Sequence, residues 1–196
     1  KFMIYTMGGS LGLLVAVQLL GVRFGTYNLL EIQQLWNSLD PASPLLGVIS
    51  VGTVKTVAFW AFVIAFAVKV PLWPFHTWLP DAHTNAPTAA SVILAGALLK
   101  MGGYGMIRLC VSILPQVAVQ YAPIMVILAL IGILYGAAVT LRQTDLKRLI
   151  AYSSVSHMGM VLLGVFPLTE VSMTGSSLQM VSHGLLTGLL FAMAGF

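Results

Sequence analysis

Charged residues are scarce in this chain, and their scarcity excludes most classes of protein. Of its 196 residues, 7% are charged and 59% are hydrophobic, and the mean hydropathy is +0.98. Soluble domains carry about 25% charged residues, whereas disordered chains combine low hydrophobicity with high net charge. The composition therefore predicts an all-α integral membrane protein.

The sequence also lacks the residues that hold most cofactors. Cys110 is its only cysteine, which excludes an internal disulfide and a cysteine-based zinc or iron–sulfur site within the chain. It contains no phosphate-binding loop, dinucleotide motif, Ser-His-Asp spacing, haem motif or flavin motif. We therefore expect no cofactor and no redox chemistry on this chain. Its basic residues are scattered singly through apolar sequence and form no basic face, so nucleic acid is not expected as a partner.

Long apolar runs are what the sequence has in abundance. A helix needs about 20 residues to cross about 30 Å of hydrocarbon. Six runs approach or exceed that length, at residues 2–22, 45–70, 87–111, 119–141, 149–166 and from 171 to the end. The connection 25–44 resembles a short amphipathic helix lying at the membrane surface. No linker or repeat divides the runs, so we expect one transmembrane domain over residues 1–196, cut at both ends from a longer protein.

The basic residues of the connections indicate an orientation. Lys1, Arg142, Lys147 and Arg148 fall on one side of the alternating spans, and Arg23 and Arg108 fall on the other. This excess predicts that the start of the chain and the connections 71–86 and 142–148 face the cytoplasm or its equivalent.

Two lysines lie inside apolar sequence, where a charge is costly. Lys100 lies thirteen residues beyond Pro87, or about 20 Å into its span, which is too deep for its amine to reach water by snorkelling. Lys69 comes just before Pro71 and Pro74, which must break or kink the second span, and apolar residues continue after the break. A broken helix at membrane depth is tolerated where it lines a polar cavity or is buried in protein. We therefore interpret both lysines as functional, and expect Lys55, near the start of its span, to snorkel to the surface.

The acidic residues give these two lysines no partner. All five lie in connections or at the ends of spans (Glu31, Asp40, Asp81, Asp145 and Glu170). Either burial leaves the two amines neutral part of the time, or their counter-charge lies outside this chain. Both alternatives suit a group that takes up and releases protons.

The four histidines divide into two pairs. His183 lies deep in the last span beside Ser182 and Thr187, which fits either a proton path or a hydrogen bond that packs helices. His157 ends a stripe of serines, a pattern more typical of hydrogen bonds between helices. His76 and His83 lie in a proline-rich connection with no cysteine and no helical pairing of ligands, so we expect no metal site there.

Several segments carry a resemblance to a known family. They read AFAVKVP (65–71), HTWLPDAH (76–83), APTAAS (86–91), LAGALLK (94–100), QTDLKRLIAYS (143–153) and SHMG (156–159). Together they resemble the antiporter-like M subunits, or chain 4, of NADH–quinone oxidoreductases, the respiratory complex I type with its cyanobacterial and plastid relatives. The likeness covers nearly the whole chain. It implies helices six to eleven of a subunit with about fourteen, in a bacterial plasma membrane, a thylakoid or an organellar inner membrane.

The resemblance also implies roles for individual residues. Lys69 matches the lysine at the family's broken seventh helix, which pairs with a glutamate on the fifth helix that would precede Lys1. Lys100 matches the eighth-helix lysine of the central polar axis, and His183 matches a polar position on the eleventh helix near that axis. The exit residue on the twelfth helix would follow Phe196.

Two functions then compete. The first is a proton-translocating subunit in the membrane arm of an NADH– or plastoquinone-linked oxidoreductase, in which Lys69, Lys100 and His183 relay protons. Partner membrane-arm subunits would surround it, and NADH or another donor, FMN, iron–sulfur clusters and quinone would be bound by partner subunits. The alternative is a subunit of a multi-subunit cation/proton antiporter. A third interpretation, a structural spacer, predicts no special effect of losing Lys100.

Overall fold

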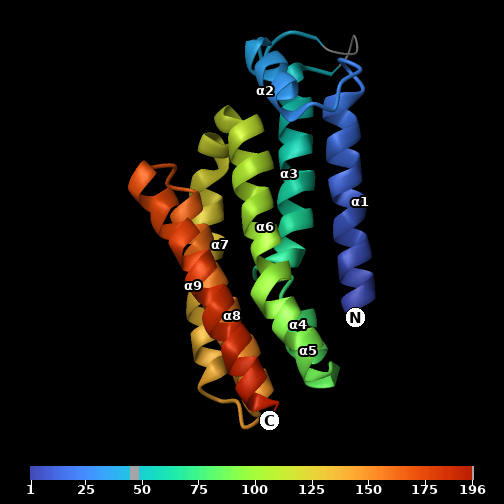
Figure 1. The fold of residues 1–196 in the computed structure, drawn as a ribbon. Coiled ribbons are helices and arrows are strands. Elements are labelled where there is room, and N and C mark those ends of the chain that lie inside the picture. The colour runs from blue at the N-terminus through green and yellow to red at the C-terminus, as the bar shows by residue number, and fades with distance from the viewer. Residues whose placement is uncertain (45–48, 196) are drawn as a thin grey trace.

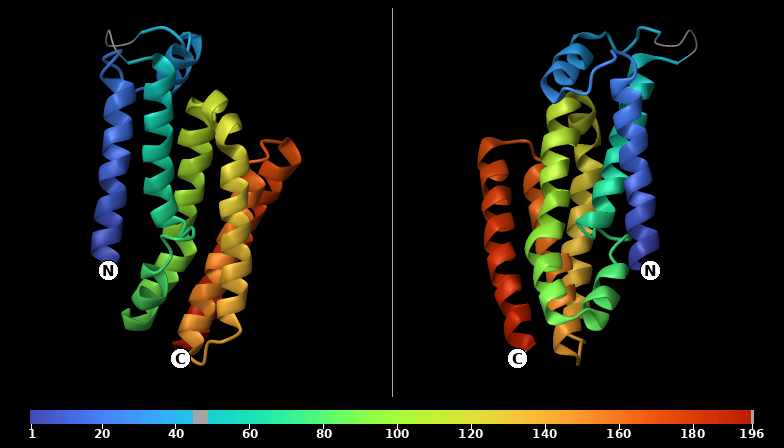
Figure 2. Two further views of the ribbon diagram at one scale, coloured as in Figure 1. Left: turned by 180° about the vertical axis from the view of Figure 1, so that it is seen from behind. Right: turned by 45° about the vertical axis from the view of Figure 1, so that its right-hand side comes forward.

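The protein is a bundle of long helices, described here from a computed structural model at residues 1–44 and 49–195. Figures 1 and 2 show helix α1 and helix α9 at opposite edges of the bundle, with both chain ends at the same end of it. The elements in chain order are α1 (Phe2–Gly21), α2 (Leu29–Ser38), α3 (Val51–Lys69), α4 (Trp78–Asn85), α5 (Thr88–Ile93), the π-helix η1 (Leu94–Leu98), α6 (Leu99–Gly105), the π-helix η2 (Met106–Val111), α7 (Pro115–Thr140), α8 (Leu146–Val165) and α9 (Glu170–Ala194). No strand is present in the described residues.

Six spans are confirmed. Six helical stretches of the described residues are long and apolar enough to cross a membrane, and the third of them, Thr88–Val111, is assembled from α5, η1, α6 and η2. Span boundaries differ from the predicted ones by a few residues, most at α3, which begins at Val51 instead of 45, and at α7, which begins at Pro115 instead of 119. Residues 45–48 of the predicted second span lie outside the described residues.

Side chains cap several span ends and so fix where the spans begin. The Asp145 carboxylate accepts the backbone N–H of Arg148 at 2.8 Å, so Asp145 is the N-cap of α8, which starts at Leu146. Ser50 caps α3 in the same way, and Thr169 forms a capping box with Ser172 at α9.

The spans pack in the order α1, α3, third span, with α7, α8 and α9 beside them. At the crossing of α7 and α8, a Cβ added to Gly136 would lie 2.7 Å from the backbone nitrogen of Ser156, and one added to Gly159 would lie 3.0 Å from the carbonyl oxygen of Ala129. The two backbones approach this closely because both positions lack a side chain. The outer faces of α1 and α9 remain apolar and exposed, as expected of helices in lipid.

The predicted interruption after Lys69 is confirmed. Helix α3 ends at Lys69 and α4 begins at Trp78, so eight residues without regular helix separate them. Trp78 is fully buried, and its indole N–H donates to the carbonyl oxygen of Val68 at 2.8 Å. This bond satisfies a carbonyl that the helix end leaves free and ties α4 back to α3. The second helix starts later than the apolar sequence after Pro74 suggested.

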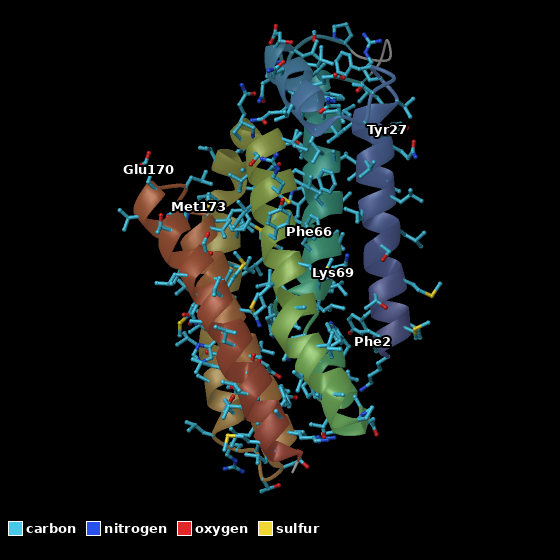
Figure 3. All side chains as sticks on the ribbon, in the orientation of Figure 1. Phe2, Tyr27, Phe66, Lys69, Glu170 and Met173 are labelled. Atoms are coloured by element: carbon cyan, nitrogen blue, oxygen red, sulfur yellow. The ribbon has the colours of Figure 1, made fainter. Side chains whose placement is uncertain are left out.

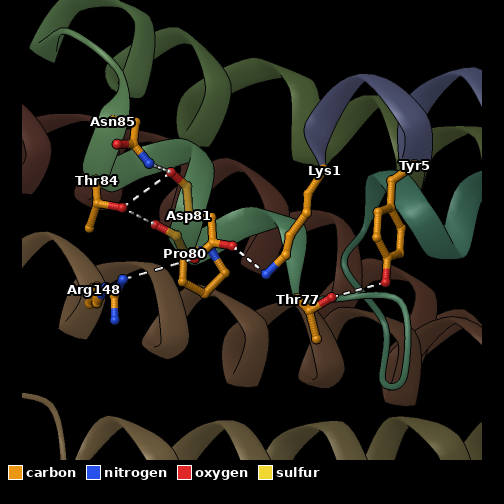
Figure 4. A network of polar contacts seen from close by, with 8 residues as sticks. All are labelled: Lys1, Tyr5, Thr77, Pro80, Asp81, Thr84, Asn85 and Arg148. Atoms are coloured by element: carbon orange, nitrogen blue, oxygen red, sulfur yellow. Dashed lines mark hydrogen bonds and ion pairs between the residues drawn. The ribbon is translucent and has the colours of Figure 1, made fainter.

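A polar network holds α4 at the end of the bundle where the chain starts. Figure 4 shows Asp81 between two cations: the Lys1 amine lies 2.8 Å and the Arg148 guanidinium 3.9 Å from its carboxylate oxygens. The hydrogen bond from Lys1, followed by the charges of Lys1 and Arg148, lowers the pKa of Asp81, and the same bond raises the pKa of Lys1. The chain start, the connection after α3 and the start of α8 therefore share one end, as the charge pattern predicted. Which compartment that end faces stays a prediction.

The opposite end is covered by α2. Its Trp36 is fully buried and donates from its indole nitrogen to the carbonyl oxygen of Leu20 at 3.0 Å, which fixes the amphipathic helix on α1. The expectation that Lys55 snorkels is wrong. Its side chain is 3% exposed, and its amine donates to the carbonyl oxygen of Leu39 at 3.3 Å instead of reaching water.

Candidate functional site

Lys100 is held in the middle of the third span by two contacts. It lies twelve residues after Thr88, or about 18 Å along the helix, and is only partly exposed. Its amine donates to the carbonyl oxygen of Ala95, which belongs to η1, and lies 2.8 Å from Nδ1 of His183 on α9. Single π-turns recur at functional sites. Here the π-turn supplies the carbonyl that steadies the amine.

The second member of this pair is buried. His183 is 3% exposed, and its Nε2 lies in the interior with no hydrogen-bond partner in the described part of the chain. An ammonium group only donates, so next to a charged Lys100 the Nδ1 of His183 accepts and the ring carries its proton on Nε2. One ring nitrogen, Nδ1, is therefore bonded to Lys100, whereas the other, Nε2, has no hydrogen-bond partner in the described residues.

His157 lies beyond His183 in the same interior. The two rings have centroids 5.4 Å apart, and Nδ1 of His157 lies 3.2 Å from the side-chain amide nitrogen of Gln179. The helix-joining bond expected of His157 is therefore present, made to α9. Its ring also extends the line from Lys100 through His183 to α8.

Small residues permit the contact between Lys100 and His183. A Cβ added to Gly184 would lie 3.1 Å from the carbonyl oxygen of Gly96 and 3.4 Å from Cε of Lys100. The third span and α9 thus cross where neither has a side chain in the way. Lys100 and Gly184 also line a groove of about 710 Å³ between these two helices.

Lys69 lies apart from this pair. It is the last residue of α3, is partly exposed, and makes no hydrogen bond or ion pair with any residue of 1–44 or 49–195 (Figure 3). A Cβ added to Gly102 would lie 3.0 Å from Cβ of Lys69, so α6 packs directly on the end of α3. Lys100 is two residues from Gly102, about 200° around the helix, and therefore lies on the face toward α9. The structure brings Lys100 and His183 together and leaves Lys69 on the other side of α6.

The burial of His83 and His76 was not predicted from the sequence. His83 on α4 is fully buried and stacks on Phe191 with ring centroids 4.3 Å apart, and neither of its ring nitrogens has a partner in the described residues. Burial, helped by the charges of Lys147 and Lys100, lowers its pKa to about 4. His76 also has two unpartnered ring nitrogens there, and burial lowers its pKa. The connection they occupy looks like a loop in the sequence, and nothing in that pattern predicts its burial.

A metal site can be assessed from the same side chains. Within residues 1–44 and 49–195, no three His, Cys, Asp or Glu residues lie close enough together to hold a metal ion. Around Lys100 the described interior brings together one amine and the imidazoles of His183 and His157, which are nitrogen bases able to exchange protons.

The bundle and its interior define a class: a polytopic membrane protein with an interrupted helix and a lysine–histidine pair at mid-span. The profile of the family described as "NADH:quinone oxidoreductase/Mrp antiporter, TM" matches residues 1–196. The chain therefore belongs to this family of transmembrane antiporter-like subunits, and it is an integral membrane protein.

Individual relatives agree with this assignment. The chain is 45% identical over its whole length to NAD(P)H-quinone oxidoreductase chain 4 1 of Synechococcus sp., of which it covers 35%. Among solved structures, it is similar to a chain of respiratory complex I from Thermus thermophilus (TM-score 0.86, 32% identity, 99% of this chain and 39% of that one). It is also similar to a chain of the Mrp complex from Dietzia sp. (TM-score 0.81, 28% identity, 97% of this chain and 20% of that one). The chain spans between 35% and 38% of the length of the curated relatives that it matches.

Proposed function

We propose that this chain is the central part of a proton-translocating subunit in the membrane arm of an NADH– or NAD(P)H–quinone oxidoreductase. The observation that carries the proposal is the contact between the partly exposed Lys100 and the buried His183, 2.8 Å long and at mid-span. The identity of 45% to a quinone oxidoreductase chain, against 28% to the Mrp chain, favours this assembly over a cation/proton antiporter. In this proposal the site residues are Lys69, Lys100 and His183, within a single transmembrane domain over 1–196.

The Lys100–His183 pair carries one positive charge more stably than two. Two positive charges 2.8 Å apart in a medium of low dielectric repel each other strongly, so protonation of one base disfavours protonation of the other. The Ala95 carbonyl favours the charged amine, and the unpartnered Nε2 of His183 is the position from which a proton leaves. A change of charge nearby therefore shifts the proton from Lys100 to His183 and onward toward His157.

Lys69 is the residue whose charge would drive this shift. Its amine has no ion-pair partner in the described residues, so we infer that an acidic residue elsewhere in the full protein sets its charge. In this proposal, movement of that acid is the event that makes Lys69 pass a proton toward the Lys100–His183 pair. Because α6 separates the two sites, water must carry the proton between them.

The redox chemistry belongs to other subunits in this proposal. The sequence has one cysteine and no flavin motif, so in this proposal NADH or another donor, FMN, iron–sulfur clusters and the quinone would be bound by partner subunits. The other membrane-arm subunits would pack against the exposed apolar faces, and the membrane would be a bacterial, thylakoid or organellar one.

The experiment replaces Lys69 by Ala in the full-length subunit, within its complex. We expect proton pumping in vesicles to fall at least tenfold while quinone reduction by the peripheral subunits and assembly of the complex are retained. Arg142→Ala, which removes an exposed positive charge, is the control and should leave pumping unchanged. Unaltered pumping in Lys69→Ala, at normal subunit content, would refute the role of Lys69. Sodium-dependent transport by a complex isolated without flavin or iron–sulfur subunits would favour the antiporter instead.

A further inference from the structure

A polar pocket lies at the α2 end of the bundle, away from the proposed proton path. Its volume is about 480 Å³, and it opens between the start of α3, the start of α7 and the segment that follows α2. Six of its ten lining residues are polar: Ser50, Thr53, Lys55, Thr56, Gln116 and Gln120. A polar majority is unusual for a hollow between membrane helices.

Lys55 is the cation of this pocket, and its donors are not all used. The side chain is 3% exposed, and its amine makes one hydrogen bond in the described residues, to the carbonyl oxygen of Leu39 at 3.3 Å. An ammonium group carries three donors, so two remain. A buried charge is costly unless it is paired, which means that Lys55 is incompletely satisfied by the chain alone.

The nearest acid does not supply the missing pair. Asp40 follows α2, and its carboxylate accepts the backbone N–H of Ala42 at 3.1 Å. No carboxylate of the described residues lies within ion-pair distance of Lys55. Lys55 is the one charged residue among the described residues that line the pocket.

Further hydrogen-bond donors surround this charge. Gln116 and Gln120 are one helical turn apart on α7, both line the pocket, and neither side chain has a partner in the described residues. The hydroxyls of Ser50 and Thr53 lie 2.9 Å apart and share one proton between them, which leaves one hydroxyl proton to donate. An ammonium, two amides and a hydroxyl thus face one hollow, a set suited to an oxygen-rich anion.

The depth of the pocket indicates which anion. Lys55 lies four residues beyond Val51, or about 6 Å from the start of its span, at the level of lipid headgroups. At this level an ammonium group with neighbouring hydrogen-bond donors suits the phosphate of an anionic headgroup, by charge and by hydrogen bonding. A phosphate with a hydroxyl-bearing headgroup suits the donors, whereas a trimethylammonium headgroup is repelled by Lys55.

We infer that this pocket binds the phosphate of an anionic phospholipid of the phosphatidylglycerol type. The inference is independent of the proposed proton path, because it concerns the other end of α3. Free phosphate shares the same chemistry, so the experiment includes it as a separate arm.

The test measures protection of the complete, detergent-purified complex against heat by three probes: short-chain phosphatidylglycerol, short-chain phosphatidylcholine and inorganic phosphate. Native mass spectrometry counts the retained lipid. We expect phosphatidylglycerol to protect at lower concentration than phosphatidylcholine. Lys55→Gln should weaken its binding about tenfold or more, since it removes hydrogen bonds from a charged donor. The double variant Gln116→Leu with Gln120→Leu changes exposed side chains, tests the site should Lys55→Gln fold poorly, and should weaken binding severalfold.

Arg23→Gln is the matched control, an exposed cation at the same end of the bundle. It should leave phosphatidylglycerol binding unchanged, which separates the pocket from a general attraction between basic protein and acidic lipid. Equal protection by the two lipids would overturn the inference. So would a loss of phosphatidylglycerol binding in Arg23→Gln as large as that in Lys55→Gln, or full binding by the double variant Gln116→Leu with Gln120→Leu. Protection by inorganic phosphate without protection by phosphatidylglycerol would overturn the lipid assignment. Absence of retained phosphatidylglycerol, as expected if another segment of the full protein fills the pocket, would also overturn the inference.

Discussion

The contact between Lys100 and His183 makes the sharpest prediction, because it can be tested as a pair. Lys100→Met keeps the apolar stem and removes the amine, whereas His183→Leu removes the imidazole. If the two groups pass one proton between them, either change breaks the same step, and the double variant should pump no more slowly than the slower single variant.

The expected size follows from the geometry. The contact is 2.8 Å long, His183 is 3% exposed, and a hydrogen bond involving a charged group contributes about 1.5–3 kcal/mol. Since about 1.4 kcal/mol is a factor of ten in rate, each single variant should lose about tenfold to about 150-fold in proton transfer.

The assay is the ratio of protons pumped to electrons transferred in sealed vesicles, with subunit content checked for every variant. Two independent groups would give losses that multiply, so the double variant would pump far more slowly than either single one. That multiplicative result would refute the shared step, and so would a normal ratio in His183→Leu.

Two further predictions concern the segment around α4. The pKa of His83 is lowered to about 4 from an ordinary 6.5, so between these values only the unfolded chain binds a proton at this residue. The wild type should therefore lose about 2 kcal/mol of stability between about pH 7 and about pH 5, measured by thermal unfolding at the two pH values. His83→Phe, which keeps a ring on Phe191, should lose much less. Trp78→Phe removes the 2.8 Å bond to the Val68 carbonyl and should cost about 1–3 kcal/mol in thermal unfolding; an equal cost in Trp60→Phe, where no such bond is present, would contradict this reason.

Most of the fold could be predicted because lipid imposes one rule. Every backbone polar group in the hydrocarbon must be paired within its own helix, so an apolar run of sufficient length becomes a span whatever its details. Proline signals the break after Lys69 just as directly, since it removes a donor and clashes with the preceding turn. Asp145, at a span start, follows from ordinary capping.

The burial of polar side chains could not be predicted in the same way. His83 lies in a proline-rich connection. It is buried because α4 packs against the bundle, where the hydrogen bond of Trp78 and the ion pairs of Asp81 hold this helix. Lys55 looks like a surface lysine by its position near a span start, but α2 and the segment after it cover that end. The burial of both side chains has one cause that the sequence does not show: a sequence pattern gives depth along a helix, whereas burial depends on which other segments fold over it.

The two lysines selected by depth also differ in a way that the sequence does not indicate. Lys100 has a carbonyl and an imidazole within hydrogen-bond distance, whereas Lys69 has neither an acid nor an imidazole partner in the described residues. A relay needs both kinds of residue: one whose partners are fixed, so that a proton has a defined next position, and one whose partner can come and go, so that the proton moves in response to an event elsewhere. In the proposed relay these tasks lie on opposite faces of α6. Coupling between them therefore requires that a proton pass from the Lys69 side of this helix to the Lys100 side.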